Sequence, residues 1–304
     1  MKKQTVFRSG FVAVVGRPNV GKSTLVNSYL GQLIAPVSPR PQTTRRKQLG
    51  ILTLTNAQIV FMDTPGLHHQ VDRLGAYMNS VAETALLDAD LILWLVAANE
   101  NPHAEDKLIA EKLTVVKRLP PILLVLNKTD LIDPQTVPTR ISQYSELLPI
   151  SEAISISALT GAGREDLLLS IAEKLPEGEL LYENDQITDL YEREIAGDLI
   201  RSAVLDSLRE EVPYSVAVRV DEFTDRDEQN SHISATLFVE RESQKGIVIG
   251  KGAEMLKKIG SLARTRIETM TGRKVYLDLH VKVAQNWRND PVALRRLGYS
   301  QEKS

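Results

Sequence analysis

Near its N-terminus the chain reads Gly16-Arg17-Pro18-Asn19-Val20-Gly21-Lys22-Ser23, followed directly by Thr24. An apolar run, residues 11–15, precedes this stretch, and a helical pattern continues from it to residue 30. A glycine-containing turn between a strand and a helix directs backbone N–H groups and the positive end of the helix dipole at an anion. A lysine and a serine at its end are spaced to place an ammonium on phosphates and a hydroxyl on magnesium. The stretch therefore predicts a phosphate-binding loop in which Lys22 and Ser23 are the principal side chains.

Size and composition limit the possible protein classes. The chain has 304 residues, more than one domain usually holds, so we expect two domains. It has no cysteine, which excludes disulfides, thiolate zinc sites and cysteine nucleophiles and fits a reducing compartment. Residues 11–15 are too short for a signal-peptide core, and the longest apolar run, residues 91–98, is too short to span a bilayer. We therefore expect a cytoplasmic protein with residues 91–96 as a buried central strand.

The first 175 residues alternate between β-type runs and helical patterns. The β-type runs are residues 11–15, 50–54, 58–62, 91–96, 122–126 and 152–156. This alternation predicts an α/β fold with a doubly wound, mostly parallel sheet. We expect this domain, of the P-loop type, to occupy residues 1–178, followed by a polar linker over residues 179–188.

The remaining residues, 189–304, have the pattern of a second, α+β domain. The expected elements are a helix at 191–211, strands at 214–223 and 233–241, a helix at 254–270 and a strand at 274–283. Charge is concentrated in this half, because residues 245–296 hold twelve Lys and Arg against four Asp and Glu. This net charge of +8 leaves −10 on the rest of a chain whose total is −2. A basic patch on an acidic protein is typical of nucleic-acid binding, although a solvated basic face is the alternative.

Two segments complete the expected phosphate and metal site. Asp63-Thr64-Pro65-Gly66 follows the strand at 58–62, where a P-loop fold needs an acidic residue to hold magnesium through water. The N–H of Gly66 is placed to reach a γ-phosphate, so the segment after it would sense that phosphate. The loop at residues 39–45 is rich in proline and polar residues, and a threonine there would complete the magnesium shell. By order and spacing we favour Thr44 over Thr43.

Two further loops predict that the base is guanine. Asn127-Lys128-Thr129-Asp130 ends the strand at 122–126, and Asp130 would accept two hydrogen bonds from guanine. Adenine would leave that carboxylate unpaired, which costs about 1–3 kcal/mol or more. We expect Asn127 to tie this loop to the phosphate loop and the Lys128 stem to lie against the base. In Ser157-Ala158-Leu159, the Ala158 N–H is expected to face the guanine carbonyl.

The second domain contains a glycine-containing loop before a basic helix. The loop reads Gly250-Lys251-Gly252-Ala253, and the helix carries Lys257, Lys258 and Arg264. The arrangement resembles the clamp of a KH domain, which grips the backbone of about four single-stranded nucleotides. An ordinary glycine turn into an amphipathic helix is the alternative.

Taken together, these segments resemble the Era family, bacterial GTPases with a C-terminal KH domain that binds small-subunit ribosomal RNA. The matching segments are residues 16–24, 41–45, 63–67, 127–130, 157–159, 187–189, 210–213, Trp287 and 297–299. The resemblance implies a Mg²⁺-dependent GTPase with GTP and GDP as ligands and a type II KH domain. It also implies recognition of the single-stranded 3′ end of that RNA during assembly of the small ribosomal subunit, by a protein that acts as a monomer.

One position departs from the Era pattern, and a second departs from what GTPases in general carry. Ala253 stands where a Gly-x-x-Gly clamp ends in glycine, and Leu67 stands where many GTPases carry a glutamine that orients water. Slow intrinsic hydrolysis is therefore expected, and the resemblance suggests that Asn19 helps to place K⁺ against the phosphates; a loop-stabilising Asn19 is the alternative. Two other functions remain open: a GTP-switched RNA chaperone whose hydrolysis only resets it, and a regulator that uses the basic patch at the periphery of the membrane.

Overall fold

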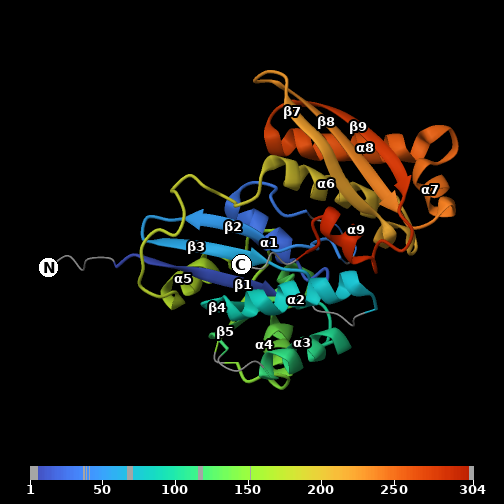
Figure 1. The fold of residues 1–304 in the computed structure, drawn as a ribbon. Coiled ribbons are helices and arrows are strands. Elements are labelled where there is room, and N and C mark those ends of the chain that lie inside the picture. Colours follow the sequence, from blue (N-terminus) through green and yellow to red (C-terminus); the bar gives the residue numbers. More distant parts are fainter. Residues whose placement is uncertain are drawn as a thin grey trace. The chain divides into compact units, whose positions relative to one another are not determined.

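The protein is seen as a computed structural model that describes residues 6–36, 38, 40, 42–66, 71–115, 119–150 and 152–300. The described residues group into two compact units (Figure 1). The first unit draws on residues 1–32, 44–69 and 78–189, and the second on residues 33–43, 70–77 and 190–304. Two short segments that precede residue 178 thus group with the C-terminal residues. In the described part of the chain, no helix is long and apolar enough to cross a membrane.

The first unit is built on a mostly parallel sheet, as the sequence predicts. Its strands are β1 (Arg8–Val15), β2 (Gln48–Thr53), β3 (Ala57–Asp63), β4 (Leu91–Ala97), β5 (Ile122–Asn127) and β6 (Ala153–Ser155). They lie in the order β2-β3-β1-β4-β5-β6, and only the β2–β3 pair is antiparallel. The predicted α/β class and parallel sheet are therefore confirmed.

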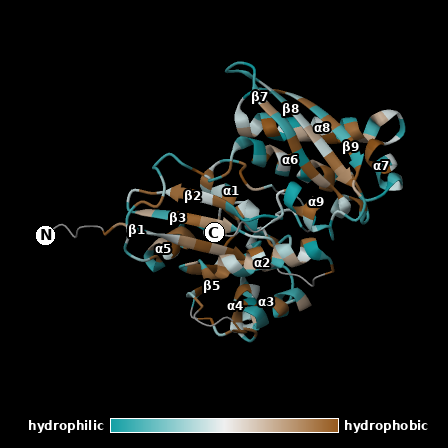
Figure 2. Cartoon of the chain, viewed as in Figure 1, coloured by the Kyte–Doolittle hydropathy of each residue, from teal (hydrophilic) through white to brown (hydrophobic). Residues whose placement is uncertain are grey.

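Helices cover both faces of this sheet. Helix α1 (Lys22–Leu30) and α5 (Arg164–Lys174) lie on one face, and α2 (Arg73–Leu87), α3 (Ala104–Val115) and α4 (Val137–Ser145) on the other. Successive residues of β4 alternate between the two cores and are all buried, because both sides of a parallel sheet are covered. Figure 2 shows the hydrophobic strands between these layers.

The second unit pairs a three-stranded sheet with helices. Its elements are α6 (Glu192–Ser207), β7 (Ala217–Asp225), β8 (Asn230–Val239), α7 (Glu242–Ile249), α8 (Glu254–Thr271), β9 (Lys274–Val283) and α9 (Pro291–Arg296). β8 lies between its neighbours, antiparallel to β7 and parallel to β9. One face of β9 is apolar and meets the helices, while the alternate residues are exposed. This is the α+β arrangement that the sequence predicts.

One helix limit and one additional helix differ from the sequence-based expectation. The helix expected to reach residue 211 ends at Ser207, because Leu208 is extended and Glu210 has a φ of +55°. Helix α7 was not predicted, since its eight residues include Gly246 and resemble a loop. The Gln244 side chain caps its start by accepting the backbone N–H groups of Glu240 and Arg241 at 2.9 and 3.1 Å.

The two short N-terminal segments are fixed within the second unit by polar contacts. Arg201 on α6 is buried and donates to the carbonyl of Gln42 at 2.7 Å. Ser38 Oγ donates to Asp206 Oδ1 at 2.5 Å. In the other segment, the N–H of Leu74 donates to the carbonyl of Arg288 at 3.0 Å. These bonds explain why residues 33–43 and 70–77 do not group with the strands that flank them.

The turn before α8 holds a strained residue. Ala253 has φ +63° and ψ +21°, the left-handed region that costs a residue with a Cβ about 1–2 kcal/mol relative to glycine. Gly252, just before it, has φ +59° and ψ +23°. A Cβ added at Gly252 would meet nothing within 4 Å, so backbone strain would be its main penalty.

We expect Ala253→Gly to raise the free energy of unfolding of the second unit by about 0.5–1 kcal/mol, and Gly252→Ala to lower it by a similar amount. Urea unfolding followed by Trp287 fluorescence, in a Trp94→Phe background that removes the signal of the first unit, measures both changes. Equal signs for the two variants would contradict the left-handed assignment.

Candidate functional site

The phosphate-binding loop connects β1 to α1, as its sequence predicts. Gly16 has φ +154°, and a Cβ there would lie 2.3 Å from the carbonyl oxygen of Leu95. Gly21 has φ +103°, and a Cβ there would lie 2.3 Å from Asn127 Nδ2. Both positions therefore exclude a side chain, so the close approach of backbone at this loop depends on the two glycines.

Lys22 lies at the start of α1 with its ammonium held inside the loop. Its Nζ donates to the carbonyl oxygens of Gly16 at 2.9 Å and Arg17 at 3.1 Å. Burial lowers the pKa of Lys22, and the nearby carboxylates of Asp63 and Glu105 oppose that shift. The cation is thus held by backbone carbonyls and has one anionic neighbour, Asp63, among the predicted site residues.

Ser23, Thr44 and Asp63 come together from three separate segments. Ser23 Oγ donates to Asp63 Oδ2 at 2.7 Å, and Thr44 Oγ1 donates to the same oxygen at 3.0 Å. The two hydroxyl oxygens are 3.5 Å apart. Thr43 is turned away, because its hydroxyl donates to the carbonyl of Arg40. The structure thus assembles the predicted metal-binding set and brings in Thr44, the favoured threonine.

The chemistry of this set fits a hard divalent cation. Burial raises the pKa of Asp63, and the charge of Lys22 and the Ser23 and Thr44 hydroxyls oppose that shift. Asp63 Oδ1 is buried, and no hydrogen-bond partner for it occurs among the described residues. Hydroxyl and carboxylate oxygens are the donors that Mg²⁺ takes, usually with substrate phosphates and water. A magnesium ion would therefore provide a positively charged partner for this buried carboxylate.

The turn after β3 is only partly described. Thr64 is buried, and its hydroxyl donates to the carbonyl of Val14 at 3.4 Å. Pro65 and Gly66 follow it, with Gly66 near Pro18 of the phosphate loop. Leu67 lies outside the described residues, so its expected place at the attacking water stays a prediction.

Asn127 joins the base-recognition loops to the phosphate loop. Its Nδ2 donates to the carbonyl of Val20 at 2.7 Å, as predicted, and its Oδ1 accepts the N–H of Ala158 at 2.8 Å. This second bond differs from the expectation that the Ala158 N–H faces guanine. The carboxamide can bond to both loops because β5 and β6 are adjacent, so it takes the donor that was assigned to the base.

Lys128, Thr129 and Asp130 continue from Asn127 at the end of β5. Lys128 has φ +66°, and a short 3₁₀ turn covers Thr129–Leu131. Asp130 is exposed, so its carboxylate is accessible to a base. The following loop leaves Leu159 81% exposed, and Ser157 is buried beside it.

The other loop residues have different surroundings. Pro18 and Thr24 are partly buried, while Asn19 is exposed with φ +65°, a conformation that asparagine tolerates better than most residues. The Arg17 side chain forms ion pairs with Glu100 and Asp106. Neither carboxylate has a sequence signal, because only the fold brings residues 100 and 106 beside the phosphate loop.

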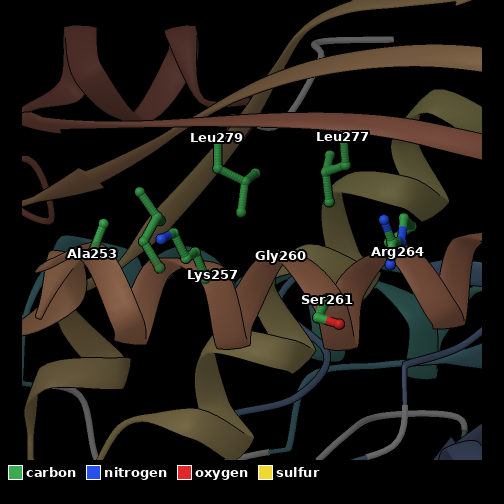
Figure 3. Close-up of a pocket in the computed structure, with 8 residues that line it drawn as sticks. Ala253, Lys257, Gly260, Ser261, Arg264, Leu277 and Leu279 are labelled. Atoms are coloured by element: carbon green, nitrogen blue, oxygen red, sulfur yellow. The ribbon is translucent and has the colours of Figure 1, made fainter.

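The second unit has a groove between α8 and β9, with a volume of about 310 Å³ (Figure 3). Lys257 and Arg264 carry charge along α8, and Leu277 and Leu279 point at the helix from β9. The full lining is Ala253, Leu256, Lys257, Gly260, Ser261, Arg264, Leu277 and Leu279. Gly260 has no side chain to fill the middle of this wall. Cationic and apolar side chains thus line the same groove, a combination that suits a flat base attached to a phosphate.

The predicted RNA-binding residues are divided by this groove. Ala253, Lys257 and Arg264 line it, while Lys251 and Lys258 are exposed beside it. The loop from Gly250 to Ala253 forms the turn at its end. The positions 253, 257, 260 and 264 repeat at helical spacing, so the α8 wall was readable from the sequence. The β9 wall was not, since the sequence does not say which helix covers an alternating strand.

Comparison with known proteins agrees with both units. Residues 11–128 match the family described as 50S ribosome-binding GTPase, and residues 211–288 match the KH domain family. A structure of Era in complex with MgGDPNP and nucleotides 1506–1542 of 16S ribosomal RNA is 40% identical, with a TM-score of 0.91, covering 97% of this chain and 100% of that chain. A point variant of Aquifex aeolicus Era bound to GDP and AlF₄⁻ is 39% identical, with the same TM-score and coverage. The family resemblance predicted from the sequence is confirmed, and the chain belongs to the Era family of GTPases.

Proposed function

We propose that this protein binds and hydrolyses GTP with Mg²⁺ and holds the single-stranded 3′ end of small-subunit ribosomal RNA during assembly of the small ribosomal subunit. The observation that carries the proposal is the similarity, over nearly the whole chain, to an Era structure that contains a magnesium nucleotide and a ribosomal RNA fragment together. The convergence of Ser23, Thr44 and Asp63 beside Lys22 supports the nucleotide half. The groove between α8 and β9 supports the RNA half.

In the nucleotide site, Lys22 and the backbone N–H groups of residues 16–24 would hold the phosphates. Ser23 and Thr44 would bind Mg²⁺ directly and Asp63 through water; the ion would neutralise charge on the phosphates. Gly66 would present its N–H to the γ-phosphate. We infer that Asn19 helps to place K⁺, on the resemblance alone. Among the described residues no side chain is an obvious water-orienting group, which supports slow intrinsic turnover.

The base would be selected by the loops after β5 and β6. Asp130 would accept the two guanine donors, with the Lys128 stem against the ring and Thr129 and Leu159 shaping the loops around it. Asn127 already bridges the two loops and the phosphate loop, which supports a rigid pocket. In RNA binding, the turn at Gly250–Ala253 would carry the phosphate backbone, and Lys251, Lys257, Lys258 and Arg264 would supply the charge.

We also propose that the protein acts as a monomer in the cytoplasm. The main alternative is a GTP-switched RNA chaperone, and single-turnover hydrolysis with and without RNA separates it from an enzyme that RNA activates. Peripheral membrane association is tested by flotation with anionic vesicles while RNA competes for the basic patch.

Guanine selection is tested by Asp130→Asn. We expect this change to weaken GTP binding by at least about tenfold, since one charged acceptor is worth about 1.5–3 kcal/mol. Xanthosine triphosphate should gain affinity, because it presents an acceptor where guanine presents a donor. Calorimetric titration with both nucleotides measures the change. Unaltered GTP affinity would remove Asp130 from the base site.

The phosphate and metal roles are separated by two variants. Lys22→Ala should weaken GDP binding by about tenfold or more even in EDTA, because it removes a charge that bonds directly to phosphate. Ser23→Ala should leave binding in EDTA nearly unchanged and raise the magnesium concentration needed for hydrolysis. Titrations of Mg²⁺ against hydrolysis rate measure this difference. A Ser23→Ala variant with the magnesium dependence of the wild type would show that Ser23 is not a metal ligand.

The RNA site is tested by the salt dependence of single-stranded RNA binding. Removing a lysine that contacts phosphate should reduce the slope of log affinity against log salt by roughly 0.7. We expect that reduction for Lys251→Ala and Lys257→Ala. Lys258→Ala, one residue further along the same helix, should show a smaller one because it does not line the groove. Lys112→Ala, in the first unit, is the control and should leave the slope unchanged. Unaltered slopes for all three lysines of the second unit would show that this face is only solvated.

A further inference from the structure

The Arg17 side chain is ion-paired with two carboxylates. One Arg17 guanidinium nitrogen bonds to Glu100 Oε2, and Nε lies 3.3 Å from Asp106 Oδ2. The Arg17 side chain is only 12% exposed, and that of Asp106 is fully buried. An ion pair with so little access to water is screened weakly, although Arg17 Nε makes no hydrogen bond in the described residues. Arg17 is therefore attached both to the loop after β4, which contains Glu100, and to the first turn of α3, which contains Asp106.

The surroundings of Asp106 require a cation beside its carboxylate. It lies in the first turn of α3, where its Oδ2 accepts the N–H of His103 at 2.9 Å and the Tyr144 hydroxyl lies 3.5 Å away. Burial raises the pKa of Asp106, while the His103 N–H and the Arg17 charge oppose that shift. No other cation is ion-paired with Asp106 in the described residues. A buried carboxylate is costly unless it is paired, so Arg17 is needed to keep it charged.

Glu100, in the loop between β4 and α3, contacts the same guanidinium. Its carboxylate is 36% exposed and also lies 3.1 Å from His103 Nε2. The loop is braced by Arg140 on α4, whose Nε donates to the carbonyl of Ala98 at 2.9 Å. Glu100 and Asp106 are thus fixed to the protein core by contacts that do not involve the phosphate loop.

Arg17 connects these acids to the phosphate-binding lysine through its own backbone. Its carbonyl oxygen accepts a hydrogen bond from Lys22 Nζ at 3.1 Å, while its side chain is fixed by Glu100 and Asp106. If the side chain is released, the Arg17 peptide is free to rotate and Lys22 loses one of its two carbonyl contacts. The direction of the ammonium toward a phosphate would then be set by Gly16 alone.

We propose that Glu100 and Asp106 are positioning residues for GTP binding and hydrolysis, which act by fixing Arg17 so that its carbonyl orients Lys22. The inference rests on the proposed role of Lys22. In metal sites, residues that orient a ligand-contacting group typically change affinity or activity by about 10- to 100-fold when they are replaced, and here the two acids act on Lys22 through Arg17. Neither acid would touch the nucleotide.

The test uses Asp106→Asn in the full chain, because the amide keeps the size of the side chain and an acceptor for the His103 N–H. We expect GDP affinity and the single-turnover rate of GTP hydrolysis each to fall by roughly tenfold. Glu100→Gln, at a partly exposed position, should give a smaller loss of the same kind and serves if Asp106→Asn does not fold. The matched control is Glu83→Gln on α2. It breaks the ion pair with Lys112, which lies on α3 like Asp106, and should leave GDP affinity and the hydrolysis rate unchanged.

A double-mutant cycle separates positioning from a general structural effect. In a Lys22→Ala background, Asp106→Asn should weaken GDP binding no further, since its effect passes through Lys22. Arg17→Lys should retain part of the function that Arg17→Ala loses, because it keeps the charge without the planar fork. Wild-type affinity in both acid variants, or losses that multiply with Lys22→Ala, would overturn the proposal. If Lys22→Ala by itself leaves GDP affinity unchanged, the role of Lys22 fails instead, and the two failures are distinguishable.

Discussion

The nucleotide site depends on one topological constraint, the shared direction of parallel strands. β1, β3, β5 and β6 run the same way, so their carboxyl ends lie along one edge of the sheet. Each end supplies one loop: the phosphate loop, the turn at Asp63, the loop at Asn127 and the loop at Ser157. Ligands bind at this edge in open α/β sheets because loops from distant parts of the chain meet there. The hydrogen bonds of Asn127 to Val20 and Ala158 are direct consequences of that arrangement.

Burial of charge then determines how the site is held. Lys22, Asp63 and Asp106 are all buried, and an unpaired buried charge is costly. Lys22 meets this cost with two backbone carbonyls, Asp63 with two hydroxyls, and Asp106 with Arg17 and the His103 N–H. The pairing leaves one oxygen each of Asp63 and Asp106 without a hydrogen-bond partner in the described residues, and at Asp63 the neighbouring hydroxyls of Ser23 and Thr44 fit a cation.

The groove of the second unit depends on packing and backbone conformation. Its groove has one wall from α8 and one from β9, and the helix begins at a turn where Ala253 takes a left-handed conformation. The position tolerates alanine because φ near +60° is unfavourable but allowed for a small side chain. Ala253 thus keeps this conformation despite its cost. In the helix that follows, Lys257 and Arg264 line the groove opposite Leu277 and Leu279.

Local sequence was sufficient where function depends on residues close together in the chain. The loop from Gly16 to Ser23 predicted its own structure, because glycine spacing, the following helix and the position of Lys22 are local properties. The parallel sheet followed from alternating periodicities, and the basic helix α8 from its helical pattern and its charged residues. The limits of α6 and α7 were less predictable, since eight residues with a glycine give a weak helical signal and tertiary contacts decide where a helix stops.

Tertiary structure alone decided which distant residues meet. Ser23, Thr44 and Asp63 each had a sequence signal. The register of β3 beside β1, however, places Asp63 Oδ2 where both hydroxyls donate to it. No signal placed Glu100 and Asp106 beside Arg17, because acids in a loop and at a helix start are ordinary in sequence and become distinctive only when burial removes their water. The Ala158 N–H is a second example. The sequence predicted that it faces guanine, whereas in the fold it donates to Asn127 Oδ1. Sequence identifies which groups are available, whereas packing decides which of them are desolvated together.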